Sequence, residues 1–172
     1  MADRVSVTMS LGGTLPRNLL VDLEQAIAED DASTDWEGTA FSRELLTREE
    51  PLVLMACEVA WGRFEAIEQF CLVYGLPFVR WSGGCTGSFP PERIVFTGSG
   101  DLHYFTASED DEILISKEDV DRLATIEAIR AHFGKAAFTV PALILADCVA
   151  DQSEGSRTTT SDSSGDIGSV GR

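Results

Sequence analysis

The sequence has little of what usually marks a metal-binding, disulfide-linked or membrane-spanning chain. It has only two histidines, His103 and His132, and its four cysteines are far apart with no CxxC spacing. A zinc site needs closely spaced cysteine and histidine ligands, so the sequence predicts neither a metal site nor a cofactor. No apolar run approaches the roughly 20 residues that span a bilayer, and the N-terminus lacks the apolar core of a signal peptide. We therefore expect a cytoplasmic protein without a disulfide framework.

Basic residues are also scarce. The chain has 29 acidic and 13 basic residues, a net charge of −16, and residues 1–150 hold 25 of the acids and 11 of the bases. Such a surface repels nucleic acid and anionic membranes, so we expect no direct binding to either. It is compatible with a basic protein as partner, although acidity for solubility alone is the simpler interpretation. Only two of the bases are lysines, and this preference for arginine, with abundant alanine and glycine, suggests a GC-rich bacterial or phage source.

The most clearly patterned stretch is residues 51–81. An apolar run over 51–57 predicts a buried strand, and residues 76–81 predict a second one. Between them, apolar side chains recur at three- and four-residue steps, which is typical of one face of a helix; they are Phe64, Ile67, Cys71 and Tyr74. The pattern predicts a strand–helix–strand unit, with Cys57 and Cys71 as small core residues.

The rest of the chain predicts an α+β fold, with a mixed or antiparallel sheet and two to three helices. Residues 5–11 alternate as a half-buried strand does, and residues 16–29 carry a helical apolar stripe, with Thr14 as its cap. A strand at 36–41 would complete a ferredoxin-like βαββαβ order. A β-meander is expected next, with strands over 93–97, 102–107 and 112–116. A C-terminal helix is then predicted from Ser116 to Phe133, and it would be two helices if Thr125 caps a second one. A last strand is predicted over 138–145.

The predicted domain organisation is one globular domain over 1–150 and a disordered tail over 151–172. The tail consists largely of serine, threonine, glycine and aspartate. Such a composition buries too little apolar surface to offset the entropy of ordering it.

The glycine-rich loop over residues 81–93 is the candidate binding surface. Cys85 in this loop would need a base to act as a nucleophile, and His103 is the conceivable one. The loop's glycines would suit a phosphate, but a strand follows where a phosphate loop normally opens a helix. A plain loop is the simpler interpretation. The candidate residues are Arg80, Trp81, Gly83, Gly84, Cys85, Arg93 and His103.

Two further predictions concern single side chains. Glu58 ends one predicted strand and Arg80 interrupts another, so we expect them to form an ion pair at the sheet edge, either structural or holding an anionic ligand. The tryptophans are core or interface residues. We expect Trp61 in the core.

Two functional hypotheses follow. The first is a non-enzymatic interaction module that acts on a basic partner, in its narrowest form a phage- or plasmid-type inhibitor or nucleic-acid mimic. The second is a small enzyme or ligand-binding domain that uses the 81–93 loop.

Overall fold

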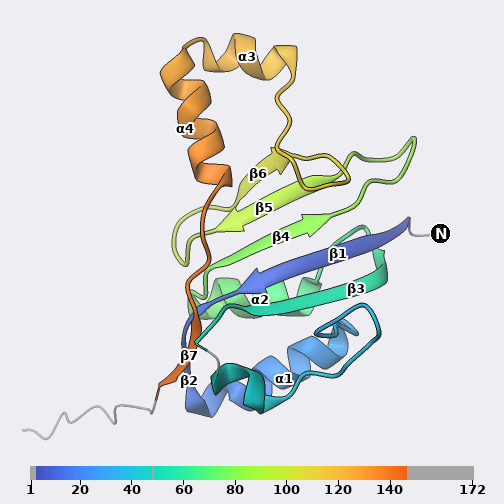
Figure 1. The fold of residues 1–172 in the computed structure, drawn as a ribbon, viewed down its shortest axis with the longest axis vertical. Coiled ribbons are helices and arrows are strands. Elements are labelled where there is room, and N and C mark those ends of the chain that lie inside the picture. Colours follow the sequence, from blue (N-terminus) through green and yellow to red (C-terminus); the bar gives the residue numbers. More distant parts are fainter. Residues whose placement is uncertain (1–2, 48, 147–172) are drawn as a thin grey trace, which may run out of the picture.

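The computed structural model describes residues 3–47 and 49–146, and its centre is an antiparallel five-stranded sheet (Figure 1). The strands stand in the order β3 (Leu52–Ala60), β1 (Arg4–Leu11), β4 (Phe78–Ser82), β5 (Glu92–Phe96) and β6 (His103–Thr106). The described residues also form four α-helices, which are α1 (Leu20–Glu29), α2 (Glu65–Tyr74), α3 (Lys117–Leu123) and α4 (Ile126–Ala136), and two short 3-10 helices, η1 (Arg17–Leu19) and η2 (Arg43–Thr47). The predicted α+β class is confirmed.

The predicted strand–helix–strand unit is present as β3, α2 and β4. Its two strands are not neighbours, because β1 lies between them and pairs antiparallel with both. A bulge in β3 places Cys57 and Glu58 opposite a single residue of β1, and Glu58 adopts a φ of 60°. Cys57 alternates with the core-facing residues Leu54 and Ala56 and is exposed, so the prediction that it is a core residue was wrong, whereas Cys71 is buried as expected.

The ferredoxin-like order is not confirmed, because residues 36–41 form no strand. They belong to a loop closed by the Thr34 amide, which donates to the Thr39 carbonyl at 2.9 Å. The carboxylate of Asp35 accepts from the amides of Glu37 and Thr39 in the same loop. The side chain thus satisfies backbone groups that a strand would have paired.

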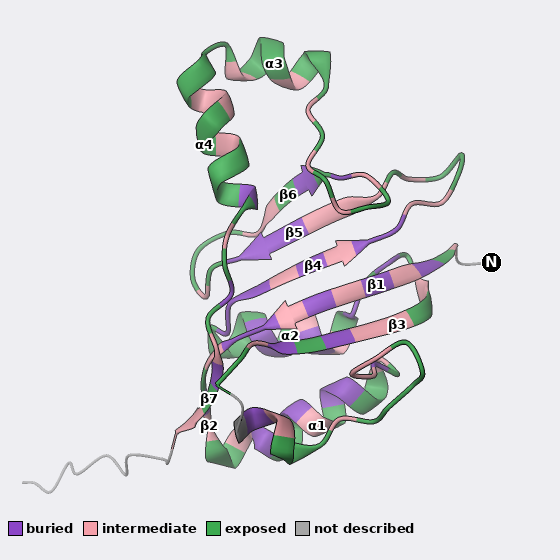
Figure 2. Ribbon diagram, viewed as in Figure 1, coloured by how far each residue is buried: buried purple, intermediate pink, exposed green. Residues whose placement is uncertain are grey.

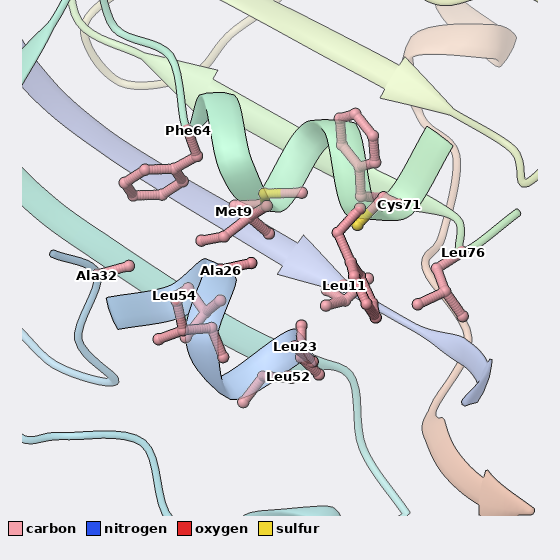
Figure 3. Close-up of a cluster of buried hydrophobic side chains, with 14 of the residues drawn as sticks. Met9, Leu11, Leu23, Ala26, Ala32, Leu52, Leu54, Phe64, Cys71 and Leu76 are labelled. Atoms are coloured by element: carbon pink, nitrogen blue, oxygen red, sulfur yellow. The ribbon is translucent and has the colours of Figure 1, made fainter. Parts of the chain in front are cut away.

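The main core lies between one face of the sheet and helices α1 and α2. Alternate residues of β1 point into it, and Figure 3 shows Met9 and Leu11 beside Leu23 of α1 and Cys71 of α2. Among residues 3–47 and 49–146, the buried cluster on the opposite face is small and consists of Val95, Phe105 and Ala136. Figure 2 shows that α1 and α2 contain buried residues, whereas almost all residues of α3 and α4 are exposed or half-buried.

A small parallel sheet joins the two ends of the described chain. Its strands are β2 (Gly13–Pro16) and β7 (Leu143–Ala146). The prediction that Thr14 caps a helix was therefore wrong, and α1 begins later. The close approach explains the choice of glycine before β2, because a Cβ on Gly12 would lie 1.9 Å from the carbonyl oxygen of Pro141.

The C-terminal half follows the predicted meander only in part. β5 and β6 form as expected, but the third predicted strand is reduced to a single bridge between Ala107 and Ile113. Ser116 and Thr125 cap two separate helices, α3 and α4. The predicted tail over 151–172 lies outside the described residues. None of the helices formed by residues 3–47 and 49–146 has both the length and the apolarity needed to cross a membrane.

Candidate functional site

The structure does not bring the residues of the predicted 81–93 loop site together. Trp81 and Arg93 lie on the face of the sheet away from α1 and α2, where the Trp81 indole donates to the Ser108 carbonyl at 3.0 Å. Arg93 pairs with the carboxylate of Asp111 and donates to the Ala136 carbonyl. Both side chains therefore hold neighbouring segments of the chain.

The loop itself bounds a hollow of about 410 Å³. Of the seven predicted residues, only Gly84 and Cys85 line it, and its one charged lining residue is Glu109. The Gly83 amide already donates to the Ser6 carbonyl, and the Gly84 amide donates to the carboxylate of Glu109. The amides of Gly83 and Gly84 therefore already have acceptors, and none of the residues that line this hollow is a cation that could bind a phosphate.

Cys85 and His103 lie at different ends of the sheet. Cys85 precedes β5, whereas His103 pairs with Val95, three residues into that strand and roughly 10 Å from its start. Desolvation and the neighbouring carboxylate of Asp3 raise the pKa of the Cys85 thiol. A raised pKa keeps the thiol protonated and unreactive at neutral pH.

Arg80 is the most deeply buried charged residue of the described chain, with none of its surface exposed. Its Nε lies 2.7 Å from Oε1 of Glu68, at an angle outside the hydrogen-bonding range. One terminal nitrogen donates to Oε1 of Glu92 at 2.7 Å, and the other donates to the carbonyl of Gly62. Desolvation raises the pKa of Glu68, against the attraction of Arg80.

The predicted ion pair between Glu58 and Arg80 was wrong. The Arg80 side chain points from β4 toward α2 and binds Glu68 and Glu92, while Glu58 is exposed at the bulge of β3. Glu58 offers its backbone carbonyl to Arg4. None of the Arg80 surface is exposed, so its guanidinium is closed off from an anionic ligand in solvent.

Three adjoining hollows lie along the side of the molecule where α1 ends and α2 begins. We call them the Trp36 hollow, the Glu58 hollow and the Trp61 hollow, with volumes of about 640, 380 and 520 Å³. The first two share Asp31, Ala56 and Cys57 as lining residues. The Glu58 and Trp61 hollows share Arg63 and Glu65. We call these three neighbouring hollows together the groove.

Carboxylates dominate the Trp36 and Glu58 hollows. Two bases, Arg4 and Arg63, line them against seven acids, which are Glu24, Glu29, Asp30, Asp31, Asp35, Glu58 and Glu65. Four of the acids are exposed and form no ion pair with any residue of 3–47 or 49–146; they are Glu29, Asp31, Glu58 and Glu65. We call these four the groove carboxylates.

Asp30 joins the two helices beside the groove. Its carboxylate accepts from the amides of Ala66 and Ile67, at 3.3 and 2.9 Å, and so caps α2 from the end of α1. Burial raises the pKa of Asp30, the two amides oppose the shift, and the charges of Glu29 and Glu65 add to it. The neighbouring carboxylates are thus close enough to repel one another.

Two tryptophans lie in the groove, one in each end hollow. Trp36 is 51% exposed and Trp61 is 52% exposed. The prediction that Trp61 belongs to the core was therefore wrong. Exposed aromatic rings are typical of interfaces, where they supply most of the binding energy.

The groove was missed in the sequence, although one signal pointed to it. The run from Glu29 to Asp31 ends a helix, where negative charge opposes the helix dipole. At Asp30 the amides of α2 offset this unfavourable interaction with the helix dipole. Glu29 and Asp31, on either side of it, face the groove. The remaining members come from β3 and α2, which only the fold brings beside them.

No protein-family model matches this chain, and no curated protein or solved structure is significantly similar to it. Across the part of the chain that the structure describes, no three histidine, cysteine, aspartate or glutamate side chains are grouped as a metal site would require. The groove is therefore characterised by its own geometry and charge.

Proposed function

We propose that the protein is a non-enzymatic interaction module that acts in the cytoplasm and binds a basic segment of a partner protein along the groove. The observation that carries this proposal is the set of four groove carboxylates, which are exposed, close together and free of ion pairs within the described chain. Side chains of lysine or arginine would neutralise them and relieve their mutual repulsion.

The size of the groove agrees with a segment of chain as the ligand. The three hollows have volumes of about 380 to 640 Å³ each and are open to solvent along one side of the molecule. A small metabolite would occupy one such hollow. An extended peptide is the ligand that spans several and presents one basic side chain after another.

The test is the binding of a fluorescent oligolysine peptide to the full chain, measured by anisotropy at several salt concentrations. We expect affinity to fall steeply with salt and to fall roughly tenfold or more when the four groove carboxylates become amides (Glu29→Gln, Asp31→Asn, Glu58→Gln and Glu65→Gln). The matched control neutralises four other exposed acids, through Asp101→Asn, Asp110→Asn, Glu112→Gln and Asp121→Asn.

Both quadruple variants have the same net charge, so they separate the groove from the overall acidity. Equal losses in the two variants would mean that only the net charge of −16 attracts the peptide. Binding that does not respond to salt would reject a basic partner. The narrower hypothesis of a nucleic-acid mimic predicts in addition that duplex DNA competes with the protein for a DNA-binding partner.

A further inference from the structure

The Trp61 hollow differs from the other two in its chemistry. It is lined mainly by aromatic and proline side chains, and its rim is formed by the start of α2 and by strands β5 and β6. The residues that define it are Trp61, Phe89, Pro90, Pro91, Glu92 and Tyr104. Trp61 is 52% exposed and Tyr104 is 57% exposed, so both rings offer an accessible face.

The Trp61 ring is presented by a rigid turn. Trp61 and Gly62 have φ values of 55° and 64°, and a Cβ on Gly62 would lie 2.7 Å from Cβ of the buried Ser82. Buried Arg80 donates to the Gly62 carbonyl, and the Trp61 amide donates to the Asp3 carbonyl at 2.8 Å. The centroids of the Trp61 and Phe89 rings lie 6.3 Å apart. The hollow is thus preorganised, which lowers the entropy cost of binding.

Two hydrogen-bond donors at this hollow are unused. Among the described residues, neither the indole N–H of Trp61 nor the hydroxyl of Tyr104 has a protein partner. Donors beside exposed aromatic faces suit a polyproline II segment. Such a segment has no internal hydrogen bonds, so its carbonyls are free to accept, and its proline rings pack against aromatic side chains at a small entropy cost.

We infer that the Trp61 hollow binds a proline-containing segment in the polyproline II conformation, and that basic residues of the same segment continue into the Glu58 hollow. Charge complementarity supports this order, since the two hollows meet at Arg63 and Glu65 and the Glu58 hollow is lined by five acids against two bases. This inference rests on the proposed function, because it adds a proline anchor to a basic ligand.

The experiment compares three synthetic peptides against the full chain by anisotropy and by quenching of tryptophan fluorescence. They are three repeats of Lys-Pro-Pro, of Lys-Ala-Ala and of Gln-Pro-Pro. We expect the first to bind at least roughly tenfold more tightly than the second, and the third to bind more weakly than the first but measurably. The first and third peptides share the polyproline II backbone, and the first and second share the charge.

The outcomes separate this inference from the proposed function. Equal affinity for Lys-Pro-Pro and Lys-Ala-Ala would overturn the polyproline II inference and leave a basic partner in place. Equal affinity for Lys-Pro-Pro and Gln-Pro-Pro would reject the basic partner and leave the proline site. If both proline peptides fail to bind at about 1 mM, which corresponds to only about −4 kcal/mol, the inference is overturned.

Variants locate the site on the protein. Trp61→Gly keeps a residue that tolerates the positive φ, and we expect it to weaken Lys-Pro-Pro binding roughly tenfold or more. Tyr104→Phe keeps the ring and removes the donor, so a loss of a few-fold is expected. Tyr74→Ala, an exposed aromatic outside the three hollows, is the control and leaves affinity unchanged. Unchanged binding in both Trp61→Gly and Tyr104→Phe would place the proline site elsewhere and reject the inference.

Discussion

Helices α1 and α2 bury seven side chains between them, whereas α3 and α4 bury only Ala136. The caps show the opposite distribution. Ser116 and Asp119 form a capping box at α3, and Thr125 caps α4 with its own hydroxyl. Neither α1 nor α2 has a hydrogen bond from the side chain of its own N-cap residue.

The two helix pairs therefore show two sources of helical order in one chain. α1 and α2 are held by burial of an apolar face, and α2 receives its cap from Asp30 of the neighbouring segment. α3 and α4 meet at a corner beyond the edge strand β6 (Figure 1), and their starts are held by the local caps of Ser116 and Thr125. Substitutions in the first pair should change the stability of the whole fold, and those in the second should act locally.

The largest contrast is expected between two arginines. Arg80→Met would remove a wholly buried cation and leave the partly buried Glu68 without its main cationic partner, and removing one partner of a buried ion pair costs about 3–5 kcal/mol. Arg122→Met in α3 removes an exposed i, i+3 pair with Asp119, and its unfolding midpoint should match that of the wild type. Urea denaturation at neutral pH measures both. Similar midpoints for the two variants would remove the distinction between the pairs.

The next contrast uses two isoleucines. Ile67 of α2 has no exposed surface, and Ile67→Ala should lower the unfolding free energy by about 2–5 kcal/mol. Ile126 of α4 is 57% exposed, and Ile126→Ala should change the unfolding free energy by less than about 0.5 kcal/mol. A large loss of unfolding free energy in Ile126→Ala would show that α3 and α4 are packed as tightly as α1 and α2.

A smaller effect is expected from the caps. Asp30→Ala and Thr125→Ala each remove a cap, a change that costs about 1 kcal/mol. For Asp30 the loss should appear in global unfolding, because α2 belongs to the main core. For Thr125 it should appear only as faster amide exchange in α4. Native-state hydrogen exchange measured by NMR distinguishes global from local unfolding. A uniform loss of protection in Thr125→Ala would contradict local unfolding of α4.

The smallest effects concern pH, and the two regions should respond in opposite directions. The pKa of Glu68 is raised in the folded protein, so its contribution to stability is complete below its unfolded pKa and is lost as pH rises through the raised value. The pKa of Asp119 is lowered to about 2 by Arg122 and by Ser116. Its contribution is complete above its unfolded pKa and is lost as pH falls through about 2.

Variants isolate these two contributions. The stability difference between the wild type and Glu68→Gln should change with pH only across the window between the ordinary and the raised pKa. A ¹³C titration of the Asp119 carboxyl should give a midpoint of about 2, and Ser116→Ala should shift this midpoint upward. A midpoint at the ordinary aspartate value in the wild type would mean that the capping box does not persist in solution.

The predictions from the sequence succeeded where the signal was local. The alternation over β1, the helical stripe of α2 and the capping box at Ser116 each depend on residues a few positions apart. The prediction for 36–41 failed because Asp35 binds the loop amides that a strand would have used. Thr14 failed as a helix cap because a strand about 130 residues away pairs with β2.

The candidate site was harder to predict than the fold. Arg80 was correctly singled out as unusual, but its partners Glu68 and Glu92 lie on α2 and β5, and no spacing in the sequence relates them. The groove carboxylates come from α1, the loop after it, β3 and α2. In the sequence, each of these residues has the features of an ordinary surface acid. Their proximity follows from the pairing of β1 with β3 and the packing of α1 on α2.

The pairing of β2 with β7 also sets an order of events during synthesis. Gly13 meets Leu143, about 130 residues later in the chain. At a translation rate of about 5–20 residues per second, β2 waits roughly 6 to 26 seconds on the ribosome before its partner is made. The sheet strands β3, β4, β5 and β6 all emerge in that interval. The five-stranded sheet can thus form before β7 is synthesised, whereas β2 stays without its partner until β7 follows, and a nascent chain that stops short of β7 exposes an unpaired strand.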